Sequence, residues 1–256
     1  MSAPFAWHSL RTRLPGEWEI TTYEKDPVRG RIEFSTLDGP MASLAWAPAK
    51  RKQPRDLWER SEDSHEGLIA VSARSASCRT WTWTFLPPAL AHADQVLNDC
   101  TDLPDGLQEY TLHGIHARVP ESYAVSGISV YPGNILLSFE DDKRRRLVFR
   151  RWGLPGQLLR GLTPEAFFTR LLETERFRIE DVREKSFQDH PATRLLFSAP
   201  GLTPLDRLRF RRAQGRGWIW HDTDAKRLLT FEQLGPPTLP LPDPDDCFGS
   251  SELSPG

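Results

Sequence analysis

A row of arginines near the C-terminal end of the sequence is the strongest candidate for specific chemistry. Arg207, Arg209 and Arg211 alternate with a leucine and a phenylalanine, and side chains two residues apart on a strand share one face. Guanidinium groups in a row can bind carboxylates or phosphates through paired N–H donors. These arginines, with Arg216, are the candidate anion-binding strip. The sequence favours the other interpretation, a solvated sheet face whose arginines are neutralised by carboxylates on adjacent strands.

Residues 235–256 are rich in proline and acidic residues. Proline removes backbone donors, so this composition predicts an extended tail rather than a helix or strand. Phe248 is the only aromatic residue of the tail and is expected to anchor it on a partner, as stiff extended segments do. Asp243 and its neighbouring aspartates make the tail the nearest acidic candidate for the arginine strip. The alternative is a terminus with no binding role.

Motifs for catalysis or metal binding are missing from the sequence. His113 and His116 are three residues apart, a spacing that shares one face of a helix but not of the strand expected here. The sequence holds no nucleophile elbow, phosphate-binding glycine loop or dinucleotide fingerprint. We therefore predict no catalytic residue, no metal site and no cofactor. An enzyme remains an alternative, because carboxylates that meet only in space leave no sequence signal.

Nine tryptophans could form a stacking platform for a sugar or a base. Residues 79–83 and 216–220 both read Arg-x-Trp-x-Trp, which places each indole pair on one face of a strand. We expect these tryptophans to be core residues. Trp7 and Trp58 are the best candidates for exposure, because they lie outside the firmest predicted strands.

The bulk composition narrows the classes of partner. A formal net charge of −2 attracts neither nucleic acid nor anionic membranes. Three cysteines without metal-type spacing suit free thiols in a reducing compartment, and residues 1–8 lack the features of a secretory signal. No apolar run is long enough to span a membrane. We expect a soluble cytoplasmic protein whose partner is another protein, not nucleic acid or a membrane.

An internal repeat organises the chain. Residues 7–20 and 112–125 match in residue type after a shift of 105 positions, and alternating apolar residues in both predict strands. A helix is predicted only after the second copy, with Thr163 as N-cap and Pro164 first; residues 54–60 would form a weaker counterpart. The corresponding pairs are His8–His113, Arg13–Arg118, Pro15–Pro120, Trp18–Tyr123 and, further along, Trp46–Trp152.

These elements define the predicted fold class, which is α+β: two tandem, strand-rich modules, each an antiparallel sheet packed on a helix. The modules are expected at 5–86 and 108–234, joined by a linker at 87–107 that includes a helix over 89–99. The Leu-Pro-x-x-Trp segment ending at Trp18, together with Thr-Pro-Glu from Thr163, resembles the PsbP-like and Mog-like fold. That resemblance implies a small α/β sandwich that works by binding other proteins, and it supplies no catalytic residues.

The sequence thus predicts a non-catalytic protein-binding adaptor or an accessory subunit of a larger assembly. Arg207, Arg209, Arg211, Arg216 and Phe248 are the predicted binding residues, and an acidic segment of the partner is their predicted ligand. The alternative function is an enzyme or a small-ligand-binding protein with its site in a cleft between the modules.

Overall fold

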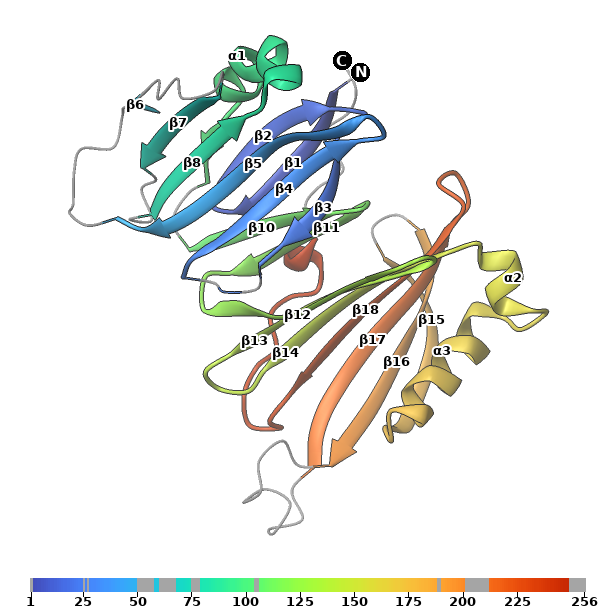
Figure 1. Cartoon of the computed structure of the whole chain (residues 1–256). Coiled ribbons are helices and arrows are strands. Elements are labelled where there is room, and N and C mark those ends of the chain that lie inside the picture. The colour runs from blue at the N-terminus through green and yellow to red at the C-terminus, as the bar shows by residue number, and fades with distance from the viewer. Residues whose placement is uncertain are drawn as a thin grey trace. The chain divides into compact units, whose positions relative to one another are not determined.

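The computed structural model describes residues 2–24, 26, 28–49, 58–59, 68–74, 79–103, 106–187, 190–200 and 212–248. Within these ranges the protein is mainly β, with three antiparallel sheets and a few short helices (Figure 1). The prediction of a strand-rich antiparallel protein is confirmed. The chain divides into two compact units, the first formed by residues 1–121 with 248–256 and the second by residues 122–247.

Two β-hairpins form the first sheet of unit 1, which we call the hairpin sheet. Strands β1 and β10 meet at its centre, but they pair only at Trp7↔Tyr110 and His8↔Glu109. Because of this pairing, the hairpin expected to open the second module belongs to unit 1. The sheet order is β11 (Ile115–Pro120), β10 (Leu107–Leu112), β1 (Ser2–His8), β2 (Leu10–Pro15) and β9 (Thr101–Asp102).

A six-stranded sheet and one helix complete unit 1. Helix α1 (Leu90–Asn98) lies within the segment predicted as a linker helix, and its Val96 carbonyl accepts a hydrogen bond from Thr12 of β2 at 2.6 Å. The weaker helix predicted over residues 54–60 is wrong at residues 58–59, which form a strand. The sheet order is β3 (Glu19–Tyr23), β4 (Gly30–Thr36), β5 (Gly39–Pro48), β8 (Arg79–Phe85), β7 (Ile69–Arg74) and β6 (Trp58–Glu59).

Aromatic side chains fill the core of unit 1. Trp7 is only 1% exposed, so the prediction that it is exposed is wrong. It lies on the β1 face that packs on the larger sheet, with its ring 6.1 Å from Trp46 and 5.2 Å from Tyr110. Trp81 and Trp83 are also buried, as predicted for the Arg-x-Trp-x-Trp strand. The side chain of Trp58 lies outside the described residues.

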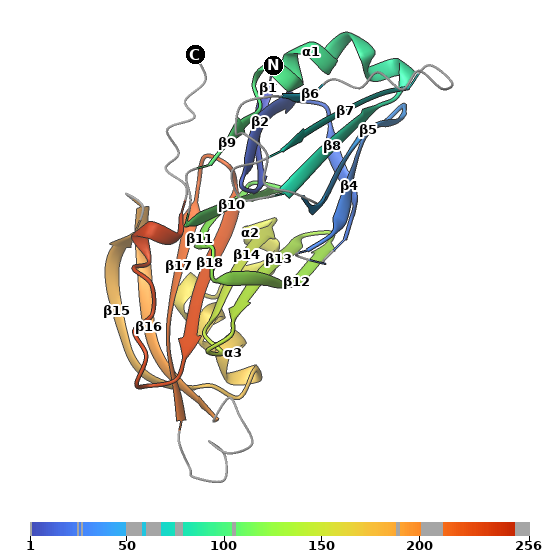
Figure 2. The same cartoon turned by 90° about the vertical axis from the view of Figure 1, so that its left-hand side faces the viewer.

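Unit 2 consists of one seven-stranded sheet with helices α2 (Pro155–Leu159) and α3 (Pro164–Thr174) (Figure 2). Thr163 caps α3 as predicted, since its hydroxyl accepts a hydrogen bond from the Ala166 amide at 3.1 Å. Phe168 and Leu172 of α3 are fully buried in an apolar cluster with the sheet. The sheet order is β12 (Tyr123–Tyr131), β13 (Asn134–Asp141), β14 (Arg146–Gly153), β18 (Arg227–Gly235), β17 (Arg212–Asp222), β16 (His190–Pro200) and β15 (Arg178–Phe187).

The pairing registers of the two halves coincide under the shift of 105 residues. Glu19 pairs with Ser35, and Ala124 pairs with Glu140 at the shifted positions. Further equivalences follow the same shift: the β-bulges at Ile20/Thr22 and Val125/Gly127, and the hairpin turns in which His8 and His113 adopt φ of 55° and 46°. A positive φ is uncommon for residues other than glycine, so the shared turn geometry reinforces the match.

Two details of the predicted repeat are wrong. The register pairs Gly30 with Trp46 and Ile135 with Arg151, so Arg151 rather than Trp152 corresponds to Trp46. A slip of one residue turns a side chain to the opposite face of a sheet, and Trp152 accordingly packs against Phe167 of α3. The two Arg-x-Trp-x-Trp segments do not correspond either, because β8 adjoins β5, whereas β18 and not β17 adjoins β14.

Candidate binding pocket on the hairpin sheet

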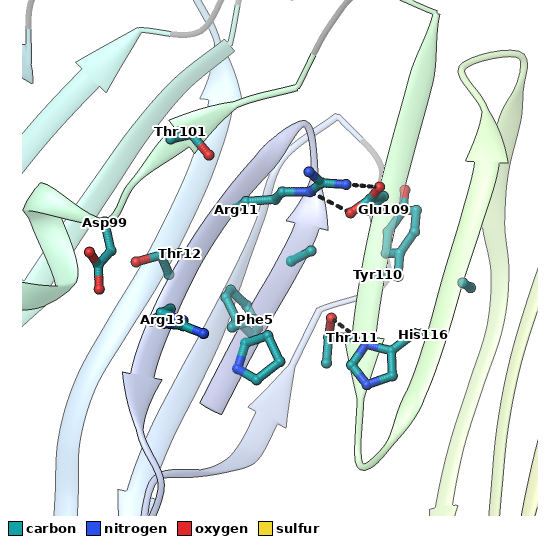
Figure 3. Close-up of a pocket in the computed structure, with 13 residues that line it drawn as sticks. Phe5, Arg11, Thr12, Arg13, Asp99, Thr101, Glu109, Tyr110, Thr111 and His116 are labelled. Atoms are coloured by element: carbon teal, nitrogen blue, oxygen red, sulfur yellow. Dashed lines mark hydrogen bonds and ion pairs between the residues drawn. The ribbon is translucent and has the colours of Figure 1, made fainter. Parts of the chain in front are cut away.

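A cavity of about 360 Å³ opens on one face of the hairpin sheet (Figure 3). It is lined by Pro4 and Ala6 of β1 and by Thr111 of β10, all just beyond the two positions where these strands pair. Arg13 of β2 and His116 of β11 line it from the flanking strands. The cavity therefore lies where the two hairpins cease to pair.

Glu109 binds two arginines at one end of the pocket. Arg11 donates two hydrogen bonds to its carboxylate, one of them from Nε to Oε2 at 2.6 Å. Arg118, directly opposite Glu109 on β11, places its Nε 3.6 Å from Oε1. Paired donors of this kind hold a carboxylate in one orientation. The charge of Glu109 is thus shared by two guanidinium groups.

Arg13 has no such partner. It is half-buried and forms no hydrogen bond or ion pair with any residue that the structure describes. Its cross-strand neighbour is Pro4, at the position that corresponds to Glu109 in the second hairpin. Proline offers neither charge nor donor, so Arg13 has no carboxylate across from it on the neighbouring strand. Asp99 lines the same cavity but forms no ion pair with Arg13 among the described residues.

A buried polar network lies at the pairing of β1 with β10. The Tyr110 hydroxyl donates to Gln108 Oε1 at 2.6 Å and lies 2.8 Å from His8 Nδ1. A hydroxyl has one proton, so it must accept from Nδ1, which places the imidazole proton there. Burial, reinforced by repulsion from Arg79, lowers the pKa of His8 to about 3, and the Gln108 contact offsets this only in part. The histidine is therefore neutral at physiological pH.

Two of the five predicted binding residues lie in the part of the chain that the structure describes. Arg207, Arg209 and Arg211 lie outside the described residues. Arg216, on β17, donates to the carbonyl of Pro242 and to Gln233, so its contacts are within its own chain. Phe248 forms an isolated antiparallel bridge with Ala117, a residue of the pocket lining.

Arg150 and two of the three cysteines are buried. Arg150 is 5% exposed and forms ion pairs with Glu232 at 2.9 Å and Glu175 at 2.6 Å. Cys100 and Cys247 are buried free thiols, and Cys78 is outside the described ranges. Among the residues described, no three potential metal ligands gather in one place. The helices described there are too short or too polar to cross a membrane.

Sequence reasoning missed the pocket, although its signal was present. Arg11 and Arg13 alternate on β2 as His116 and Arg118 do on β11, and the shift of 105 residues superimposes the two pairs. The aligned Arg13 and Arg118 were visible as part of the repeat. The two arginines differ in environment because Pro4 lies across from Arg13 and Glu109 lies across from Arg118. The strand pairing is needed to see this difference.

The structure is that of a mainly antiparallel β protein with a cavity lined in part by charged side chains. No protein-family model matches the chain, and no curated protein matches it. Among solved structures, it is similar to the immunity protein TplEi of T6SS from Pseudomonas aeruginosa, in the apo form and in complex with the "L" peptide. Each of the two matches has 10% identity, covers 98% of this chain and 92% of the other, and has a TM-score of 0.29. A TM-score this low does not establish a shared fold.

Proposed function

We propose that this chain is a non-catalytic protein-binding adaptor or accessory subunit of the cytoplasm, and that the hairpin-sheet pocket receives an acidic segment of its partner. The observation that carries the proposal is Arg13, a half-buried cation with no partner among the described residues in a cavity with small side chains at Pro4 and Ala6. A carboxylate would supply the missing charge and accept from two guanidinium N–H groups.

The charge distribution favours a side-chain or terminal carboxylate over a polyanion. Glu109 already occupies Arg11 and Arg118, and Asp99 also lines the cavity. A nucleic-acid strand would bring several phosphates to a pocket in which one arginine remains to be matched. One acidic residue on an otherwise neutral segment fits this balance better.

We further propose that the two halves derive from one duplicated module of the PsbP-like or Mog-like kind, each with a sheet and a helix. The shared pairing registers and bulges support this proposal. The topology also supports it: in both large sheets three consecutive strands form a meander, and the last strand of the module pairs with the third. Duplication would supply the two similar hairpins from which the pocket is built.

The test is capture of a partner with the Arg13→Glu variant. Tagged wild-type chain is used as bait in native extract, and bound proteins are identified by mass spectrometry. Arg13→Glu should lose the specific partner, because a carboxylate in the pocket repels an acidic segment. The melting temperature should change little, since Arg13 has no described partner to lose. Arg29→Glu makes the same charge change at an exposed bend outside the pocket lining and should retain the partner.

Pro4→Glu is a second variant that leaves Arg13 in place. The new carboxylate at position 4 would lie across from Arg13, as Glu109 lies across from Arg118 in the other hairpin. It should therefore weaken capture as Arg13→Glu does. If both variants capture the partner as well as wild type does, the pocket is not the binding site.

A small carboxylic acid is the second candidate ligand, because a volume of about 360 Å³ lies within the range of small-molecule sites. Thermal-shift titration with short mono- and dicarboxylates distinguishes it. Millimolar stabilisation by such an acid, lost in Arg13→Glu and retained in Arg29→Glu, would favour a ligand-binding protein over an adaptor.

A further inference from the structure

The part of the tail that belongs to unit 2, up to Cys247, contacts the sheet of that unit through backbone carbonyls. Arg145 donates to the Pro240 carbonyl at 2.9 Å. Arg216 and Gln233 both donate to the Pro242 carbonyl, at 2.7 and 3.0 Å. Two neighbouring side chains on β17 and β18, together with Arg145 in the turn between β13 and β14, therefore donate to two carbonyls that are two residues apart. The sequence analysis expected tail aspartates on an arginine strip, whereas the described contacts are mainly with the peptide backbone.

The sheet itself holds these donors in position. Arg216 and Gln233 are direct cross-strand neighbours on β17 and β18, and Arg216 Nε donates to Gln233 Oε1 at 2.5 Å. Since that bond occupies the amide oxygen of Gln233, its Nε2 group points to the tail. Arg216 also lies over the Trp218 ring at 5.6 Å. A site whose donors are fixed before the ligand arrives loses less entropy on binding.

Arg145 is fixed in the same way. Its Nε donates to Asp141 at 2.7 Å, and its guanidinium lies 5.5 Å from the centre of the Tyr123 ring. Neither contact involves the tail. The whole set of donors is thus held by contacts within unit 2. Gly217, next to Arg216 on β17, faces Phe168 of α3, so the side chain of Arg216 lies on the opposite face of the sheet.

The tail has few buried side chains to hold it there. Between residues 236 and 247 only Cys247 is fully buried, and half of the segment is exposed, including Pro240 and Asp243. Leu241 lies against Gly235, and Asp243 is close enough to Arg216 to interact with its charge. Segments with little buried apolar surface open at low free energy without unfolding the sheet.

We propose that Arg145, Arg216 and Gln233 form a binding site for extended Pro-x-Pro-Asp segments, that the tail is its resident ligand, and that a partner protein's segment of this type exchanges with the tail. Proline-rich segments are already extended and carry regularly spaced carbonyls, so they suit a site made of fixed donors beside aromatic rings. The acidic residue after the second proline is close enough for its charge to interact with that of Arg216. This site is separate from the pocket on the hairpin sheet and does not depend on its function.

The experiment uses the full chain and a fluorescein-labelled peptide of residues 236–246, with anisotropy as the readout. The peptide should bind wild type saturably, and a scrambled peptide of the same composition should not. Asp243→Lys in the chain weakens the resident tail only, so it should raise the affinity for the wild-type peptide about two- to fivefold. Asp245→Lys, an exposed tail position without a described contact to the donors, should bind like wild type.

Two further measurements keep the result independent of folding defects. Arg216→Gln in the Asp243→Lys chain should reduce peptide affinity by about tenfold or more, because a charge-assisted hydrogen bond is lost. A peptide that carries Asp243→Lys should bind more weakly than the wild-type peptide to each of the chains tested. This comparison changes the peptide and leaves the protein unaltered. Absence of saturable binding to the Asp243→Lys chain, or equal binding of the scrambled peptide, would overturn the proposal. Concentration-dependent dimers formed by tail exchange would instead assign the site to a second copy and overturn the partner assignment.

Discussion

The buried His8 makes a sharp prediction about pH and stability. Its pKa is lowered from 6.5 to about 3 in the folded protein, while the unfolded chain protonates near the ordinary value. Between pH 6.5 and about pH 3, His8 is therefore protonated in the unfolded state and neutral in the folded state. The contribution of His8 to stability is complete above about pH 6.5 and is lost progressively as the pH falls toward 3.

The size of this loss follows from the shift. Each pKa unit corresponds to about 1.4 kcal/mol, so acidification from pH 8 to about pH 4.5 should cost roughly 2.7 kcal/mol of unfolding free energy through this one group. No discount for solvent screening applies, because His8 is 1% exposed.

The measurement compares wild type with His8→Asn in urea unfolding followed by tryptophan fluorescence. Asparagine tolerates the positive φ of this position and cannot titrate. His8→Asn should be less stable than wild type at pH 8, because the ring contacts with Trp46 and Tyr110 are lost. Between pH 8 and pH 4.5 the wild type should lose about 2.7 kcal/mol of unfolding free energy relative to His8→Asn. Contributions of other titrating groups are common to both chains and cancel.

His113→Asn is the matched control. It makes the same change at the corresponding turn, where φ is 46°, away from the His8–Tyr110–Gln108 network. Its difference from wild type should not follow the His8 titration. A pH-independent difference between wild type and His8→Asn would refute the reasoning, because it would mean that the folded protein protonates His8 as readily as the unfolded chain.

Two further predictions concern packing and charge. Gly30→Ala should destabilise the protein by about 1–3 kcal/mol in urea unfolding, because a Cβ at Gly30 would lie 2.3 Å from the buried Trp46 ring; Gly156→Ala, with nothing within 4 Å of its Cβ, should be neutral or slightly stabilising. Burial raises the pKa of Glu232 to about 7 despite the neighbouring Arg150, so its contribution is greatest below the ordinary carboxyl pKa and is lost as the pH rises through 7. Glu232→Gln should flatten this part of the pH–stability profile, and an unchanged profile would contradict the raised pKa.

The sequence was informative wherever structure depends on near neighbours. Thr163 and Pro164 begin α3 as expected, because capping involves only the first turn of a helix. The hairpins were recognisable because Leu14 and Val119, like Pro15 and Pro120, lie in strands whose alternation is local. The burial of Trp7 was not recognisable, since its face is decided by contact with Trp46 on a different sheet.

The binding features depended on contacts that are distant in sequence. Arg145 meets Pro240, and Glu109 meets Arg11, across about a hundred residues, and composition cannot identify such pairs. Arg207, Arg209 and Arg211 were predicted to share one face of a strand because they alternate with apolar residues. Alternation predicts only that face. It does not say whether an arginine will meet a carboxylate, a carbonyl or nothing.

The pocket shows how a repeat can create a site by an imperfection. Both hairpins carry an arginine at the same position, Arg13 and Arg118, and the same register sets one residue across from each. In the second hairpin that residue is Glu109, and the charge is matched within the sheet. In the first it is Pro4, which leaves Arg13 unmatched among the described residues and keeps the side chain opposite it small. A glutamate at position 4 would have placed a carboxylate across from Arg13 as well, so the proposed binding of an external carboxylate depends on this difference between the hairpins.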